Sequence, residues 1–278
     1  MITEFQDGFI TKTKLNELVG GINANSEDIS GLNSDLSNLI IEINAKVLTA
    51  NVTKTVGSGG DFVTLTEALN WCKTLIPNGF TLTLSLLVGY QIEPLDYTNV
   101  DFGFVNLISS DGLHRGHISN PASVDFLFKF TNSISFNLGL IVDGKNNSTG
   151  YIGSGLGLLS NSYMKILLGC GFYNFMVSIR LTNMSRLHSY GSCKLFSSNS
   201  AFGGVMLQDC SEANLFGATI GDVYAFQMSK VNISSAILMA TRTNINVGEG
   251  SIVLANNSAN AILSQTANTI TANGIIFQ

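Results

Sequence analysis

TLTLSLLV, residues 81–88, opens a series of short apolar runs that continues to the end of the chain. Each run is about 4 to 10 residues long and is bounded by Gly, Asn, Ser or Asp, and no amphipathic helix of useful length separates one from the next. Later runs include SISFNLGLIV (133–142), YMKILLGC (163–170), KVNISSAIL (230–238) and NTITANGIIF (268–277). They recur at irregular intervals of roughly 20 to 30 residues, which is typical of solenoids.

This pattern predicts a mainly β fold, a right-handed parallel β-helix. Each coil would supply two or three short strands, and the stacked coils would bury Ile, Leu, Val and Phe in one long core. Asn and Gly suit the tight corners because they tolerate left-handed backbone angles. A β-sandwich is the alternative, but its hairpins call for Asn-Gly turns. The only clear Asn-Gly pairs are Asn78-Gly79 and Asn273-Gly274, which favours the β-helix.

Residues 15–46 carry a different signal, a heptad repeat. Its seam consists of Leu15, Leu18, Ile22, Ile29, Leu32, Leu36, Leu39 and Ile43, with Asn25 and Lys46 in two polar seam positions. A stripe this narrow is buried only against copies of the same helix, so the repeat predicts a parallel coiled coil and a homo-oligomer. Asn25 would fix the register of the helices. Ile and Leu are mixed along the seam, so the pattern does not choose between two and three strands.

The composition favours an uncharged binding partner. Charged residues make up 12 % of the chain, against about 25 % in an ordinary soluble domain. The abundant Asn, Ser and Thr side chains suit partners such as sugars. The formal charge is −5 and no basic run is present, so we expect no nucleic-acid partner.

Other sequence features bear on location and on cofactors. The N-terminal MITEFQDGFITK lacks the apolar core of a signal peptide. The sequence has no run of roughly 18 apolar residues, so we expect no membrane insertion. The four cysteines, which form no close pair, are interpreted as buried free thiols; they are Cys72, Cys170, Cys193 and Cys210. No histidine has the spacing of a zinc ligand, and neither a metal nor a cofactor is expected.

Segment 51–80 predicts one short helix beside β structure. Gly57–Asp61 forms a turn, and Thr66 is the expected N-cap of a helix over 67–73. The turn lacks the Gly-Lys-Ser/Thr ending of a P-loop, so a phosphate site is not favoured.

Two stretches resemble bacteriophage proteins. FQDGFITKTKLNELVGGINAN (5–25) is similar to the N-termini of phage tail proteins. TVGSGGDFVTLTEAL (55–69) resembles the start of the pectate-lyase-like β-helix in phage tailspikes and tail fibres. The resemblance covers roughly residues 1–80.

The resemblance implies a homotrimer on the virion tail, made in the host cytoplasm, that recognises a bacterial surface polysaccharide. The N-terminal coiled coil would then be trimeric, and the N-terminus would dock on other virion tail proteins. The expected divisions are a docking segment (1–14), a coiled-coil stalk (15–50), a β-helix cap (51–80) and a parallel β-helix body (81–278).

Three functions stay open at this point: a glycan receptor binder, which we prefer, a glycan depolymerase, and a structural connector within the tail. A depolymerase needs two carboxylates that flank the sugar bond. The acid/base candidates are Asp209, Glu212 and Asp222, which neighbouring coils about 4.8 Å apart could bring together, although each could equally be a solvated turn residue.

The glycan-binding candidates are side chains that stack on sugar rings or carry charge. They are Tyr173, Tyr190 and Tyr224, together with His114, Arg115 and His117. Tyr151 and Tyr163 are also expected at the surface, whereas most Phe residues are expected in the core. A polar loop between two strands explains the His114–His117 cluster equally well.

Overall fold

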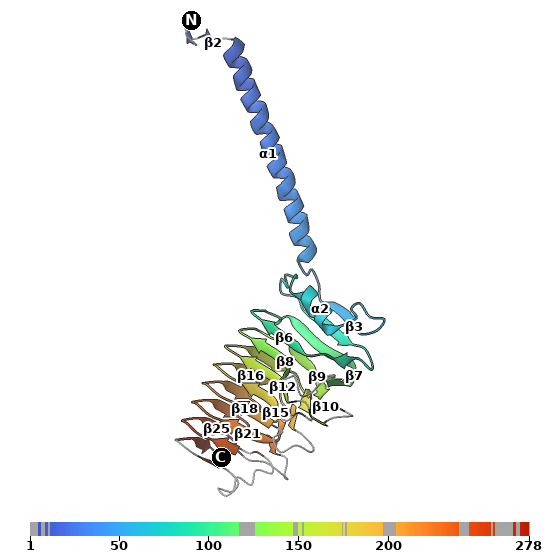
Figure 1. Cartoon of the computed structure of the whole chain (residues 1–278), viewed down its shortest axis with the longest axis vertical. Coiled ribbons are helices and arrows are strands. Elements are labelled where there is room, and N and C mark those ends of the chain that lie inside the picture. Colours follow the sequence, from blue (N-terminus) through green and yellow to red (C-terminus); the bar gives the residue numbers. More distant parts are fainter. Residues whose placement is uncertain are drawn as a thin grey trace. The chain divides into compact units, whose positions relative to one another are not determined.

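The structure of the chain is a computed structural model (Figure 1). It describes residues 5–6, 9–10, 12–116, 126–146, 150–151, 153–173, 175, 177–196, 204–238, 245–256, 258, 269–270 and 273–277. The chain divides into two compact units, residues 1–47 and 48–278. No helix in the described ranges is long and apolar enough to cross a membrane.

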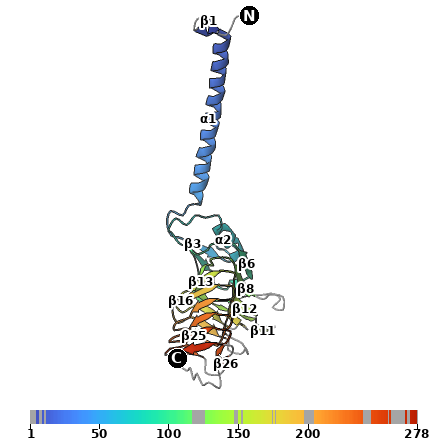
Figure 2. The ribbon, with the colours of Figure 1, turned by 90° about the vertical axis from the view of Figure 1, so that its left-hand side faces the viewer.

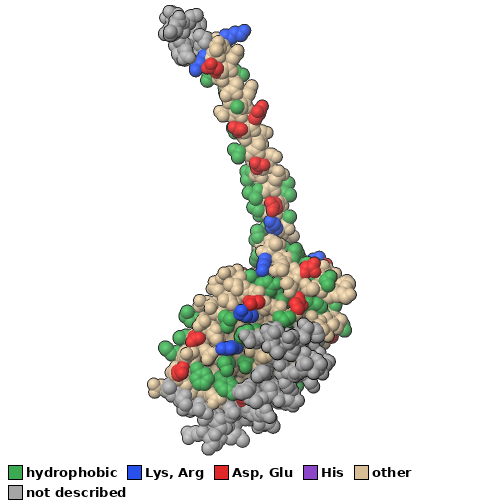
Figure 3. All heavy atoms as spheres, viewed as in Figure 1, with side chains coloured by type: hydrophobic (Ala, Val, Ile, Leu, Met, Phe, Trp, Pro, Cys, Tyr) green, Lys and Arg blue, Asp and Glu red, His purple; other side chains and the backbone are tan. Residues whose placement is uncertain are grey.

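The first unit is dominated by one long helix. Strands β1 (Phe5–Gln6) and β2 (Phe9–Ile10) pair antiparallel, and α1 (Lys12–Lys46) follows them. The helix predicted from the heptads is therefore confirmed, and it begins three residues earlier than its first seam leucine. None of its residues is buried, and Ile22 and Leu32 are 64 % and 67 % exposed. Figure 3 shows hydrophobic side chains at intervals along this helix.

The second unit is a parallel β-helix, which confirms the predicted fold and makes the β-sandwich alternative wrong. Apart from one antiparallel pair, its strands form two parallel sheets, one of eight strands and one of fifteen. The larger sheet consists of two ladders that share strands, so we describe three ladders in all. Figure 2 shows β13 (Tyr163–Ile166), β16 (Arg186–Ser189) and β25 (Ile252–Leu254) on one side of the stacked coils. Strands β6 (Leu95–Thr98), β8 (Phe126–Thr131) and β12 (Ser154–Leu159) lie on the other side. Each coil thus contributes a strand to each face in turn, as a solenoid requires.

The first ladder, which carries the site described below, begins with β3 and ends with β27. Its strands are β3 (Val52–Val56), β4 (Leu82–Leu86), β7 (Val105–Gly116), β9 (Asn137–Asp143), β13 (Tyr163–Ile166), β16 (Arg186–Ser189), β19 (Glu212–Asn214), β22 (Lys230–Asn232), β25 (Ile252–Leu254) and β27 (Ile275–Phe277).

The second ladder shares the long strands β7 and β9 with the first. Its other strands are β5 (Gln91–Ile92), β14 (Gly171–Tyr173), β17 (Lys194–Phe196), β20 (Thr219–Ile220) and β23 (Ile237–Leu238). The third ladder consists of β6 (Leu95–Thr98), β8 (Phe126–Thr131), β12 (Ser154–Leu159), β15 (Val177–Leu181), β18 (Gly204–Leu207), β21 (Asp222–Ala225), β24 (Ile245–Val247) and β26 (Thr269–Ile270). Strands β10 (Lys145–Asn146) and β11 (Gly150–Tyr151) form a separate antiparallel pair.

Aromatic side chains fill the middle of the core. The Phe172 ring packs edge-on against Phe128 and Phe175, with ring centroids 5.9 Å and 6.0 Å apart. Phe128 in turn packs edge-on against Phe136 at 5.3 Å. All four rings are fully buried, so these contacts hold successive coils together.

The four cysteines are free thiols, as predicted, but they are not all buried. Cys72 and Cys193 are buried, and burial raises the pKa of their thiols to about 12 and about 11. Cys170 is half-buried, and Cys210 is exposed. The prediction is wrong for Cys210 because this residue lies in a corner of the coil, where its side chain faces solvent.

In successive coils, the corner that precedes the strand of the first ladder repeats the same backbone conformation. Two consecutive residues have positive φ, for example Asn183 and Met184 at 54° and 61°. The corners are linked from coil to coil, because the Met184 N–H donates to the Asp209 carbonyl at 2.8 Å. Asn occupies some of these positions, as expected, but Met, Asp, Cys and Gln occupy others. The hydrogen bonds between coils compensate for the strain of this conformation.

A buried serine follows each of these corners. The serines stack at Ser133, Ser162, Ser185, Ser211, Ser229 and Ser251, and each is less than 5 % exposed. In several steps the N–H of one serine donates to the hydroxyl of the next, for example Ser162 to Ser185 at 3.2 Å and Ser229 to Ser251 at 3.0 Å. This column fixes which residue of each coil begins the first ladder.

The N-terminal coil is covered by α2 (Leu65–Cys72), the short helix predicted for this segment. The N-cap is Thr64, whose hydroxyl accepts the Glu67 N–H, and the prediction of Thr66 is wrong. Thr66 instead donates its N–H and its hydroxyl to the Glu93 carboxylate, at 2.7 Å and 2.9 Å.

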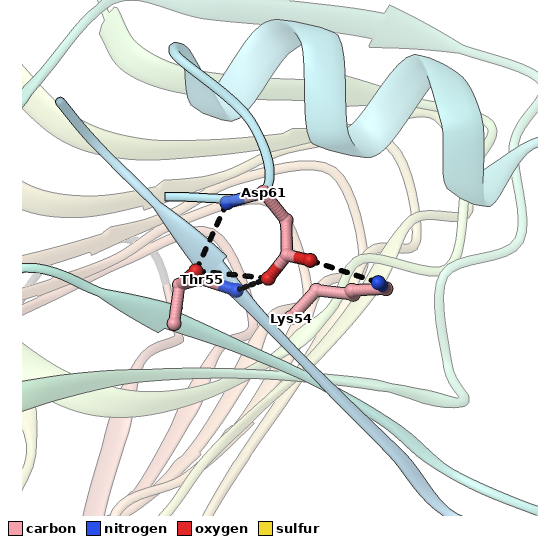
Figure 4. A network of polar contacts seen from close by, with 3 residues as sticks. All are labelled: Lys54, Thr55 and Asp61. Atoms are coloured by element: carbon pink, nitrogen blue, oxygen red, sulfur yellow. Dashed lines mark hydrogen bonds and ion pairs between the residues drawn. The ribbon is translucent and has the colours of Figure 1, made fainter. Parts of the chain in front are cut away.

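A second carboxylate closes the glycine-rich turn (Figure 4). Asp61 accepts hydrogen bonds from the Lys54 ammonium and from the N–H and hydroxyl of Thr55, each at 2.8 Å. The bond from Lys54, followed by those from Thr55, holds the pKa of Asp61 well below its usual range. The turn therefore has a structural role.

We expect Gly171→Ala to destabilise the second unit by about 3 kcal/mol. Gly171 has φ +150°, and a Cβ there would lie 2.3 Å from the Lys194 carbonyl oxygen of the next coil. Gly169→Ala is the matched control, since Gly169 has φ +76° but open space around it. It should cost about 1 kcal/mol from backbone strain alone. Urea unfolding of both variants measures the difference, and equal losses would contradict the predicted clash.

Candidate functional site

The outer face of the first ladder carries two columns of side chains. Strand residues alternate between the core and solvent, and Met164, Leu187 and Val231 point inward and are buried. The first outward column consists of Tyr163, Arg186, Glu212, Lys230 and Ile252, paired in register from β13 to β25. The second column consists of Lys165, His188, Asn214, Asn232 and Leu254.

A groove of about 550 Å³ runs over these strands, and we call it the ladder groove. Its outward lining residues are Tyr163, Arg186, His188, Glu212, Asn214, Lys230, Asn232, Ile252 and Leu254. These outward side chains are polar over β16, β19 and β22 and apolar over β25. Leu187, Ala213 and Val231 also line the groove, so its surface is more apolar than polar. A groove with both kinds of surface suits an extended, hydroxyl-rich ligand.

The charges in the groove alternate along the first column. Glu212 lies between Arg186 and Lys230, and each cation is 3.7 Å from a Glu212 carboxylate oxygen. These distances exceed hydrogen-bond length, and the side chains of Arg186 and Lys230 are 70 % and 63 % exposed. Such ion pairs contribute little to stability, so these side chains can rearrange around a ligand.

Amide and aromatic groups complete the groove. The Asn232 side-chain N–H donates to the Asn214 side-chain oxygen at 3.2 Å. The His188 ring, which lines the groove, packs edge-on against Tyr190, with centroids 4.9 Å apart. Tyr190 is 51 % exposed. Partial burial, and then the nearby Tyr190, raise the pKa of Tyr163.

The three predicted acid/base residues lie in three different environments. Asp209 lies in a corner with φ +55°, and Glu212 lies in the ladder groove. Asp222 is 3 % exposed on β21 of the third ladder, where its carboxylate accepts the Tyr224 hydroxyl at 3.4 Å. Burial, followed by the charge of Asp222, raises the pKa of Tyr224.

This arrangement bears on catalysis. Among the residues that the structure describes, the carboxylate that lines the ladder groove is Glu212. Glycoside hydrolysis uses two carboxylates that flank the glycosidic bond. Within the same part of the chain, no three His, Cys, Asp or Glu side chains gather in a way that could hold a metal ion.

The predicted glycan-binding residues are spread over the molecule. Tyr190 lies beside the ladder groove, whereas Tyr173 ends β14 of the second ladder and Tyr224 lies on the third. His114 and Arg115 belong to β7, but their side chains lie outside the described part of the structure, as does all of His117.

Sequence reasoning missed most of the groove residues. The sequence signal that could have found the first column is position: each of its residues directly follows a corner serine. These residues are Tyr163, Arg186, Glu212, Lys230 and Ile252. Aligning the sequence on these serines brings the charged residues into one column. The interval between serines varies from coil to coil, which conceals the column from a search for a constant period.

Comparisons with known proteins add no family to these observations. No protein-family model matches the chain, and no curated protein matches it.

Proposed function

We propose that the chain is a receptor-binding component of a bacteriophage tail, a tail fibre or tailspike that binds a bacterial surface polysaccharide as a homotrimer. The observation that carries this proposal is the uncovered seam of α1. Its apolar side chains, including Ile22 at 64 % and Leu32 at 67 %, are about half or more exposed in the single chain. Burying the exposed part of each side chain contributes about 1 to 2 kcal/mol, so association of copies of α1 is favoured.

The number of chains rests on the resemblance of residues 1–80 to phage tail proteins, whose members are trimers. A parallel trimer carries three identical ladder grooves on one assembly. Three weak sites bind a repetitive polymer with much higher apparent affinity than one, because the second and third contacts form at high effective concentration. A repeating surface glycan is a ligand that can use all three sites.

Binding is favoured over hydrolysis by the groove itself. Asn214, Asn232 and His188 supply donors and acceptors that suit sugar hydroxyls, and Tyr163 supplies a ring for stacking. Glu212 is the groove's carboxylate and lies between two cations, whereas Asp222 is buried on another ladder.

Two measurements on the full-length protein test the proposal. Native mass spectrometry should give about three times the chain mass of 29.7 kDa. The same preparation should bind immobilised bacterial capsular polysaccharide or lipopolysaccharide, or whole host cells. A monomer at micromolar concentration contradicts the assembly. New reducing ends in the bound glycan would establish a depolymerase. Failure to bind cells, together with capture of another tail protein through residues 1–50, would establish a connector.

A further inference from the structure

We propose that the ladder groove is specific for a polysaccharide that carries carboxylate groups, and that Arg186 and Lys230 hold such a carboxylate. This inference rests on the function proposed above and adds the chemical class of the glycan. It follows from the charge, the distances and the exposure of the groove residues.

From β13 to β22, the outward side chains of the first ladder carry an excess of positive charge. They include Lys165, Arg186 and Lys230 against the carboxylate of Glu212. Asp209 and Glu249 lie in the corners before β19 and β25. The chain as a whole has a formal charge of −5, with 14 Lys and Arg in 278 residues. The groove lining itself holds Arg186 and Lys230 against Glu212, an excess of one positive charge, which favours an anionic ligand.

The two cations are placed to bind one anion. Parallel strands put successive rungs about 4.8 Å apart, so Arg186 and Lys230 lie two rungs apart on either side of Glu212. Glu212 contacts both at 3.7 Å, which leaves their N–H groups able to donate shorter, charge-assisted hydrogen bonds to a ligand carboxylate. Glu212 therefore competes with the ligand for these cations without fixing their positions.

The remaining lining fits the neutral parts of such a polymer. Asn214 and Asn232 present side-chain amides beside the charged column, where sugar hydroxyls can donate and accept. Tyr163 lies at one end of the groove, and Ile252 and Leu254 lie at the other. These apolar surfaces suit the faces of sugar rings that lack hydroxyls.

The test uses the full-length oligomer and three immobilised uronic-acid polymers: polygalacturonate, alginate and hyaluronan. Each is compared with the same polymer after reduction of its carboxyl groups to alcohols. We expect at least one intact polymer to bind. Its reduced form should bind with an affinity at least about tenfold lower. Raising the salt from about 50 to 500 mM should weaken binding of the intact polymer, because the contacts are exposed.

Three single variants distinguish binding through the groove cations from nonspecific adsorption of the polymer. Lys230→Gln should weaken binding of the intact polymer about tenfold. Lys194→Gln removes the same charge from the exposed side of the second ladder and should leave binding unchanged. Glu212→Gln should strengthen binding several-fold, because it removes the competing carboxylate. Circular dichroism and native mass confirm that each variant is folded and assembled.

The outcomes distinguish this inference from the proposed function. Equal binding of intact and reduced polymers, or weaker binding by Glu212→Gln, overturns the carboxylate specificity and leaves glycan binding intact. No binding to any of the six polymers also overturns the inference, and binding to host cells then decides whether the proposed function stands.

Discussion

Replacing Leu32 and Leu36 with Glu should convert the oligomer that we propose into a monomer of 29.7 kDa. Both leucines lie on the seam of α1 and are 67 % and 55 % exposed in the single chain. Covering the exposed part of each leucine contributes about 1 to 2 kcal/mol, and a seam carboxylate must also lose its hydration. Association should therefore weaken by about 100-fold or more. Sedimentation velocity at micromolar concentration measures the change.

The control places the same two charges on the other face of the helix. Ser30→Glu with Ser34→Glu adds two carboxylates at exposed positions between seam residues, and the assembly should keep its mass. If the Leu32/Leu36 variant also stays assembled, the seam is not the interface. Binding of the monomeric variant to a multivalent glycan surface should fall as well, because the gain from several linked sites is lost.

Phe172→Ala should destabilise the second unit by about 3 to 5 kcal/mol. Phe172 is fully buried between Phe128 and Phe175, so its removal leaves a cavity that these rings cannot fill without moving. Stacked coils depend on their neighbours, so the loss should spread to adjacent coils. Hydrogen exchange should show lower protection in β12 and β15 as well as in β14.

The control is a phenylalanine outside the core. Phe216 is 51 % exposed at a turn of a later coil, so Phe216→Ala should change the free energy of unfolding by about 0.5 kcal/mol or less. Urea unfolding of both variants gives the comparison. A loss for Phe216→Ala as large as that for Phe172→Ala would show that the Phe216 turn packs against a partner.

Local sequence patterns predicted the helices and strands whose formation depends on residues close together in the chain. The alternating three- and four-residue steps predicted α1 because a helix repeats every 3.6 residues. The short helix α2 was also predictable, but its cap was not. Thr66 was assigned as the N-cap because Thr is a good capping residue, whereas Glu93, about one coil away in sequence, accepts both of its donors. Thr64 then caps the helix.

The candidate site was far less predictable than the fold. Arg186, Glu212 and Lys230 belong to three different coils of unequal length, and only the stacked serines show that they share a column. Asp209 and Glu212 were chosen as a local pair, and Asp222 because a neighbouring coil could bring it near them. The structure places Asp222 on another ladder, because a short coil turns to a new face within about ten residues.

The long helix with its exposed seam, the mainly β body and the stacking of its coils follow from the local spacing of apolar residues, so they can be predicted before folding is considered. Which residues meet on the outer face of the first ladder depends on the folded chain. Neighbours in a parallel β-helix are one coil apart in sequence, and the length of each coil is set by its corners and loops. Hydrogen bonds between coils, such as those of the corner serines, fix that register.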